Sequence, residues 1–191
     1  MRYNQIRECD IANGEGIGVA LFVQGCHFKC KNCFNPETWD FNGGKEWTPE
    51  VEDKFIELAS RPYIKRISIL GGEPLADENL DGILNLVNRF RHLMPQKTIW
   101  LYTGYEWEHI FDQGYHYHPL TVEKLSIGRW RRQKIVRQCD VLIDGRYIDS
   151  LRDVSLKWKG SSNQRVINVQ ESLKQNKIIL LYMMMMLIHY M

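Results

Sequence analysis

The sequence has little net charge and no long apolar run, and both absences exclude classes of protein. Its 25 Lys and Arg residues nearly balance its 23 Asp and Glu residues, which leaves a formal charge of +2. So small an excess does not by itself indicate a nucleic-acid or membrane partner. The longest uncharged apolar run, residues 178–191, is shorter than the roughly 20 residues that a membrane-spanning helix needs.

The chain also lacks an export signal and an even number of cysteines. Residues 1–10 are polar and charged, unlike a signal peptide. Five cysteines indicate reduced thiols in the cytoplasm rather than a disulfide framework. A length of 191 residues, with 44% hydrophobic and 25% charged residues, is typical of one globular domain. We therefore expect a cytoplasmic protein with one domain over 1–182 and a methionine-rich tail, 183–191, that is disordered or lies against a partner.

Short apolar segments alternate with segments of helical periodicity. Four segments are predicted to be buried strands: 19–23, 66–70, 98–102 and 139–143. Helices are predicted to begin at Pro49, near Leu80 and near Glu106, with a further one between 121 and 138. This alternation implies an α/β fold with parallel strands joined by right-handed crossovers.

Each predicted strand ends in a loop that contains glycine or cysteine. The four loops are Gly25-Cys26, Gly71-Gly72, Thr103-Gly104 and Asp144-Gly145. In parallel α/β sheets and barrels, ligands bind beyond the carboxyl ends of the strands. We therefore expect all four loops to open on one rim and to form one site.

Three of the five cysteines, Cys26, Cys30 and Cys33, fall within eight positions. Neighbouring thiols are typical ligands of iron–sulfur clusters, zinc or copper(I). A redox Cys-x-x-Cys pair would leave Cys26 without a role, and chance clustering of core cysteines is a further reading. A closed zinc site would need His27 or a remote residue as its fourth ligand. The spacing alone supports zinc and an iron–sulfur cluster equally.

Two motifs together resemble the radical S-adenosylmethionine superfamily: the cysteine motif after a first strand, and G-G-E-P after a later one. Longer segments are similar to the family of proteins that activate anaerobic ribonucleoside-triphosphate reductases: D-I-A-N-G-E-G, C-F-N-P-E-T-W-D-F-N-G-G, V-L-I-D-G-R-Y and W-K-G-S-S-N-Q-R-V-I. The similarity extends from about residue 3 to residue 181. It implies a partial, open parallel β/α barrel of the radical S-adenosylmethionine type in a single domain.

The resemblance also implies the cofactors. One 4Fe–4S cluster would be bound by Cys26, Cys30 and Cys33, which are then the metal ligands and the catalytic residues. Four-iron clusters ordinarily have four cysteine ligands, so three leave one iron open. By resemblance, the amino and carboxylate groups of S-adenosyl-L-methionine chelate that iron. One electron then releases a 5′-deoxyadenosyl radical, which forms a glycyl radical on the anaerobic ribonucleoside-triphosphate reductase. A low-potential donor such as flavodoxin would supply the electron.

Contacts with the methionine end of S-adenosylmethionine are implied for the glycine loops. Gly71 and Gly72 would let the backbone approach the cofactor closely, and Glu73 would accept a hydrogen bond from its ammonium group. Thr103 and Gly104 are further candidates for the same pocket, although both fit a strand-end turn equally well.

Contacts with the adenine end are implied for Asn32, Cys33 and Phe34. Much of the superfamily has an aromatic residue directly before the third cysteine, where this chain has Asn32. Stacking on the adenine must therefore come from elsewhere or be absent, and Phe34 is the candidate for it.

Two other functions fit the sequence. An activase of another glycyl-radical enzyme, such as pyruvate formate-lyase, would use the same chemistry on a different partner. A non-catalytic zinc or iron–sulfur module would instead bind nucleic acid through the basic run 129–137. That run fits a solvated helix face first, a docking patch for the reductase second, and phosphate contact third. The leading hypothesis is the reductase activase, expected to bind neither nucleic acid nor membrane.

Overall fold

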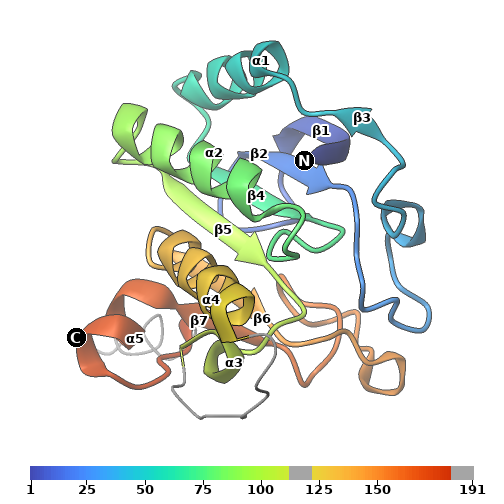
Figure 1. Cartoon of the computed structure of the whole chain (residues 1–191). Helices are drawn as coiled ribbons and strands as arrows, with labels where there is room; N and C mark the ends of the chain where they lie inside the picture. Colours follow the sequence, from blue (N-terminus) through green and yellow to red (C-terminus); the bar gives the residue numbers. More distant parts are fainter. Residues whose placement is uncertain (112–121, 182–191) are drawn as a thin grey trace.

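The computed structural model describes residues 1–111 and 122–181, which share one seven-stranded sheet (Figure 1). The strand order is β3-β1-β2-β4-β5-β6-β7. In chain order the strands are β1 (Arg2–Asp10), β2 (Gly18–Val23), β3 (Lys45–Glu46), β4 (Arg66–Gly71), β5 (Thr98–Tyr102), β6 (Val141–Asp144) and β7 (Arg165–Asn168). The helices are α1 (Pro49–Ser60), α2 (Leu80–Leu93), α3 (Trp107–Phe111), α4 (Val122–Val136) and α5 (Val169–Gln175). The predicted tail, 183–191, lies outside the described residues.

The four central strands are parallel, and they are the four that the sequence predicts. β2 pairs with β4, β4 with β5, and β5 with β6, all in parallel. The flanking pairs, β1 with β2 and β6 with β7, are antiparallel. The sheet ends at β3 and β7, so it is an open mixed sheet of an α/β domain.

Helices α1 and α2 pack on the sheet because each presents one apolar face. α1 begins where Thr48 caps it: the Thr48 hydroxyl accepts a hydrogen bond from the backbone N–H of Val51 at 3.4 Å. α2 buries Ile83, Val87 and Phe90 at helical spacing. α2 and α4 lie side by side over the sheet (Figure 1). Each large apolar side chain buried in this core contributes about 1.5–3 kcal/mol of transfer free energy, which fixes the strands whose ends carry the site.

The flanking strands were not predicted from the sequence. β1 reads R-Y-N-Q-I-R-E-C-D and is mostly half-buried or exposed, so it lacks an apolar run. It forms all the same, because its backbone completes the edge of β2, with Ile6 opposite Leu21. Within the two described ranges, no helix combines the length and apolar character needed to cross a membrane.

Candidate active site

The loops after β2 and β4 are joined through their backbones. The N–H of Gly72 donates to the carbonyl of Val23 at 2.9 Å, and the N–H of Glu73 donates to the carbonyl of Gly25 at 2.7 Å. A Cβ on Gly72 would lie 2.4 Å from the carbonyl oxygen of Gly25, so only glycine fits there. The two motifs that suggested the superfamily therefore form one continuous structure.

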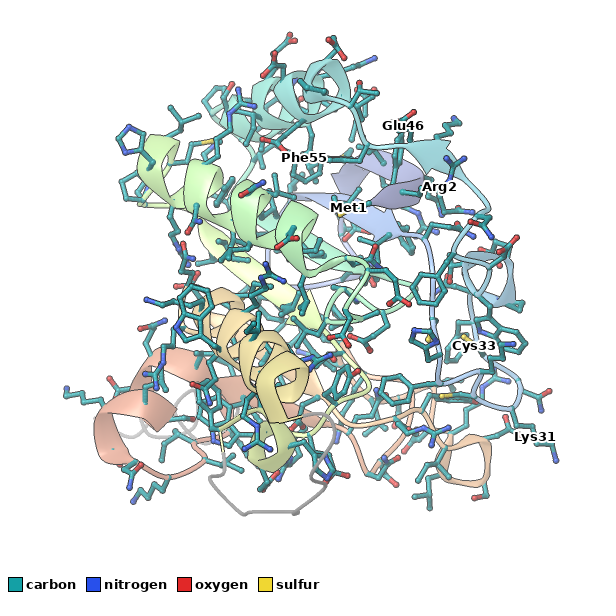
Figure 2. All side chains as sticks on the ribbon, in the orientation of Figure 1. Met1, Arg2, Lys31, Cys33, Glu46 and Phe55 are labelled. Carbon is teal, nitrogen blue, oxygen red and sulfur yellow. The ribbon has the colours of Figure 1, made fainter. Side chains whose placement is uncertain are left out.

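The three motif cysteines line a single pocket of about 550 Å³ at the carboxyl ends of the central strands. This space is called the cluster pocket below. Cys26, Cys30 and Cys33 are free and partly exposed. The loop that carries them turns through left-handed backbone at Lys29 and Asn32, with φ of 45° and 54°. Figure 2 shows Cys33 on this loop, with Lys31 pointing outward from it.

Backbone N–H groups donate hydrogen bonds to the sulfur atoms of two motif cysteines. The N–H of Asn35 donates to the sulfur of Cys33 at 3.4 Å. Burial raises the pKa of the Cys26 thiol, while hydrogen bonds from the backbone N–H groups of Phe28 and Lys29 act in the opposite direction. The Cys26 thiol therefore stays protonated without a positive partner, and metal binding would release its proton.

Three free cysteine thiols at one pocket are the type of donor that a four-iron cluster takes. Among residues 1–111 and 122–181, no three Cys, His, Asp or Glu side chains are grouped closely enough to hold one metal ion. A zinc ion holds sulfur ligands at about 2.3 Å, whereas a four-iron cluster is a larger body with ligands that stand further apart. His27, the predicted alternative ligand for zinc, is exposed and forms a hydrogen bond with Glu78 at 2.9 Å.

Glu73 is a buried carboxylate that connects the β4 loop to the β5 loop. Its Oε1 accepts hydrogen bonds from the N–H of Leu75 at 2.8 Å and the hydroxyl of Thr103 at 2.7 Å. Its Oε2 accepts one from the N–H of Gly104 at 2.7 Å. An ionised carboxylate has about four acceptor sites, so Oε2 keeps one site for a further donor. Burial raises the pKa of Glu73 to about 7, against the effect of these three donors.

The predicted loops all reach the cluster pocket. Gly71, Gly72 and Glu73 line it, as do Thr103, Gly104 and Gly145 from the loops after β5 and β6. Gly71 has φ of 103°, and a Cβ there would lie 2.8 Å from the Cα of Phe22. The common rim that strand polarity predicts is confirmed.

The residues predicted near adenine divide into two groups. Cys33 and Phe34 line the cluster pocket, and the Phe34 ring packs edge-on against Tyr147 at 5.1 Å. Asn32 is not part of the pocket lining, and its side-chain amide donates to Asp149 at 2.8 Å. The other two cysteines lie elsewhere: Cys9 is exposed on β1 and Cys139 is buried.

Sequence reasoning missed several contributors to the pocket, among them Arg7 and Trp158. Arg7 of β1 lines it and lies over the ring of Phe22 at 4.4 Å. Trp158 lines it and packs edge-on against Trp100 at 4.7 Å. A signal existed for Trp158 because it opens the segment W-K-G-S-S-N-Q-R-V-I. None existed for Arg7, because β1 itself was not predicted.

Comparison with known proteins decides the family. A family model described as a 4Fe-4S single cluster domain matches residues 12–167. The anaerobic ribonucleoside-triphosphate reductase-activating protein of Escherichia coli K12 is 38% identical over 168 residues, covering 87% of this chain and 97% of the relative. The proteins of the same name from Vibrio cholerae and Enterobacteria phage T4 are 37% and 35% identical over 166 residues, covering 86% and 87% of this chain and 96% and 93% of those relatives. The chain belongs to this family.

Membership in the anaerobic ribonucleoside-triphosphate reductase-activating proteins confirms the predicted class of enzyme. This is a radical S-adenosylmethionine activating enzyme with a 4Fe–4S cluster domain. The matched residues 12–167 include the cysteine loop, Glu73 and Trp158. The part of the chain that forms the cluster pocket is thus mostly the part that the family shares, and Arg7 lies just outside it.

Proposed function

We propose that the chain is the activase of an anaerobic ribonucleoside-triphosphate reductase. Its cluster would be bound by Cys26, Cys30 and Cys33, with S-adenosylmethionine beside it in the cluster pocket. When bound, the reduced cluster supplies the electron that splits the cofactor into methionine and a 5′-deoxyadenosyl radical, which takes a hydrogen atom from a glycine Cα of the reductase. The names of the relatives support the reductase as target.

The observation that carries this proposal is the meeting of three thiols and the Gly71–Glu73 loop in one pocket. The pocket volume of about 550 Å³ is within the usual range for small-molecule sites. Gly71 and Gly72 leave backbone open to the methionine end of the cofactor. Oε2 of Glu73 offers its remaining acceptor site to the cofactor amino group. Thr103 and Gly104 act on the cofactor through Glu73, which their hydrogen bonds hold in place.

The adenine end would lie toward Cys33 and Phe34. The Phe34 side chain is 57% exposed and stands in the pocket wall, where a flat ring system can stack on it. Asn32 would contribute through the shape of its left-handed backbone, because its side chain is bound to Asp149.

The remaining predictions complete the proposal. The central parallel strands with their crossover helices would correspond to the partial barrel of the superfamily, within one activase domain over 1–182. The protein would work in the cytoplasm, take electrons from a low-potential donor such as flavodoxin, and bind neither nucleic acid nor membrane.

The first experiment is anaerobic reconstitution with iron and sulfide, followed by electron paramagnetic resonance of the reduced protein with and without S-adenosylmethionine. We expect about four irons per chain and a signal that changes when the cofactor is added. A silent spectrum with one tightly bound zinc would favour the binding module. Incubating the active protein with the reductase or with pyruvate formate-lyase then identifies the partner, because only the true target acquires a glycyl radical.

A further inference from the structure

A second pocket lies against the other side of the cysteine loop. It has a volume of about 1060 Å³ and receives Cys30 but neither Cys26 nor Cys33. Five residues line both pockets and form the wall between them: Phe28, Cys30, Gly104, Arg146 and Tyr147. None of the residues from Gly71 to Glu73 reaches the second pocket. The proposed chemistry gives this space no role, although it borders one proposed cluster ligand.

The second pocket gathers positive charge. Five cationic side chains line it: Lys29, Lys31, Arg129, Arg132 and Arg146. Among the described residues, two carboxylates, Glu106 and Asp149, line it as well. Within the described lining, positive groups thus outnumber negative ones by three, although the whole chain carries a formal charge of only +2. We call this surface the cationic pocket.

Part of that charge is fixed in place by the fold. Arg132 donates to the carbonyl of Leu75 at 2.8 Å and pairs with Asp77 at 2.6 Å. Arg146 donates to the carbonyl of Phe28 at 2.9 Å. These hydrogen bonds restrain Arg132 and the exposed Arg146, and the exposed residues Lys29, Lys31 and Arg129 form the rest of the pocket's positive rim.

We propose that the cationic pocket is the docking surface for an acidic one-electron donor protein that reduces the cluster from the Cys30 side. This inference rests on the proposed function, which requires electrons from outside the chain. One electron leaves the reduced donor and enters the oxidised cluster, so the donor is oxidised by one electron and the cluster reduced by one. No bond forms or breaks, and no proton moves.

Location and charge favour a donor over the reductase as the occupant. The target glycine must reach the cofactor, which lies beside Gly71–Glu73 in the cluster pocket, and the cationic pocket does not contain these residues. Its volume slightly exceeds the roughly 300–1,000 Å³ of small-molecule sites. Electron-transfer encounters bury little surface and depend on complementary charge for fast association, which is what an open cationic rim provides.

The test reverses rim charges and compares two reductants. The variant is Lys31→Glu with Arg129→Glu, and the matched control is Lys54→Glu with Lys177→Glu, two exposed lysines outside both pockets. Reconstituted proteins are mixed with reduced flavodoxin, or with photoreduced 5-deazariboflavin as a small reductant without net charge. Stopped-flow absorbance reports cluster reduction, and a titration at low salt reports flavodoxin affinity.

We expect the rim variant to be reduced by flavodoxin about tenfold or more slowly at low salt, with a matching loss of affinity, because steering by charge is removed. Added salt should slow reduction of the wild type more than that of the variant. Reduction by deazariboflavin should be unchanged in the variant, and the control pair should behave as wild type with both reductants.

Several results would overturn the assignment. These are an unchanged flavodoxin rate in the rim variant, an equal fall with deazariboflavin, or no reduction of the wild-type cluster by flavodoxin. A lower glycyl-radical yield with deazariboflavin as reductant would make the pocket a reductase surface instead. Failure of the proposed function is seen separately, as a wild-type protein that does not cleave S-adenosylmethionine even when deazariboflavin supplies the electrons.

Discussion

The two ends of β4 each have a buried carboxylate nearby, and the chain treats the two groups differently. Before the strand, Asp10 pairs with Arg66 at 2.8 Å, and the side chains are 2% and 0% exposed. Burial alone would raise the pKa of Asp10, but hydrogen bonds from Arg66 and Asn13 outweigh it and lower that pKa. Beyond the strand, the hydrogen bonds that Glu73 accepts within the described residues all come from neutral donors, and burial raises its pKa to about 7.

The carboxylate near the start of β4 thus belongs to a structural ion pair, and the one beyond its end belongs to the proposed cofactor site. At the Asp10 end the protein supplies the countercharge itself, so the pair is closed and complete. At the Glu73 end Arg132 acts on the carboxyl only through its charge and forms no ion pair with it, and we propose that a ligand supplies the countercharge, since a perturbed carboxyl in a pocket is a mark of functional sites. A buried carboxyl that forms no ion pair within the described residues is therefore the better indicator of a ligand site.

The largest expected effect comes from removing one of the proposed cluster ligands. Cys30→Ala should lose stable cluster binding, and cleavage of S-adenosylmethionine should fall to background because the proposed ligand set is incomplete. Cys139→Ala is the control, since that thiol is buried away from the pocket. Iron content and deoxyadenosine release measure both. Cleavage retained in Cys30→Ala would sink the ligand assignment.

The next largest effect is expected from breaking the ion pair between Asp10 and Arg66. Arg66→Met leaves Asp10 buried without its countercharge, and the free energy of unfolding should fall by about 3–5 kcal/mol. Arg61→Met is the matched control. Arg61 pairs with Glu8 at 3.5 Å, and both side chains are accessible to water, so little change in stability is expected. Urea unfolding of the four-iron protein measures both variants. An equal small change in the two would mean that the Asp10–Arg66 pair is not structural.

A third prediction concerns the pH dependence that Glu73 imparts. A carboxyl with a raised pKa in the folded state stabilises the protein below its unfolded pKa, and this contribution is lost as pH rises through about 7. Relative to Glu73→Gln, wild type should therefore lose about 3 kcal/mol of stability between pH 4.5 and pH 7. Denaturation across that range measures the difference, and parallel curves for the two proteins would contradict it.

Cofactor affinity should depend on the same carboxyl in the opposite direction. In the proposed site the ionised form of Glu73 would accept a hydrogen bond from the cofactor amino group, so S-adenosylmethionine should bind the wild type more tightly at pH 7.5 than at pH 6. The fall should approach tenfold if the ionised form alone binds. Glu73→Gln should bind more weakly at both pH values and lose this dependence. Equilibrium titration with the cofactor measures it.

The smallest expected effect concerns the backbone contact between the loop after β2 and the loop after β4. Gly72→Ala should cost about 1–3 kcal/mol, because its Cβ would lie 2.4 Å from the carbonyl oxygen of Gly25. Gly128→Ala, inside α4, should be neutral or stabilising, since its nearest neighbour is the end of the Asp77 side chain. Thermal unfolding compares them. Equal stability of both variants would mean that the loops separate easily.

The sequence predicted the surroundings of Glu73, beyond the end of β4, far better than the ion pair between Asp10 and Arg66 at its start. Strand polarity placed Cys26, Glu73 and Thr103 at one rim, because parallel strands end together. The cysteine spacing indicated the proposed cluster ligands, and all three line the same pocket. The hydrogen bond between Thr103 and Glu73 could not be foreseen, because it joins side chains that meet only after the strands pair.

Arg66 was read as the first residue of a strand, and its complete burial was not predicted. Arginine is rarely buried without a partner, and its partner Asp10 is 56 positions away on a strand that the sequence did not reveal. The cationic pocket has the same origin. Arg129 belongs to the basic run, but Lys31 and Arg146 come from other loops, so only the folded chain shows the cluster of charge.

The backbone hydrogen bonds of Gly72 and Glu73 extend the pairing of β2 and β4 beyond the last residue of each strand. The floor of the cluster pocket is therefore sheet, with the slow amide exchange expected of a core element. Because the chain's own backbone forms this floor, we expect little ordering entropy to be lost when the cofactor binds. We also expect a molecule that has lost its cluster to need only iron and sulfide, without refolding, to regain it.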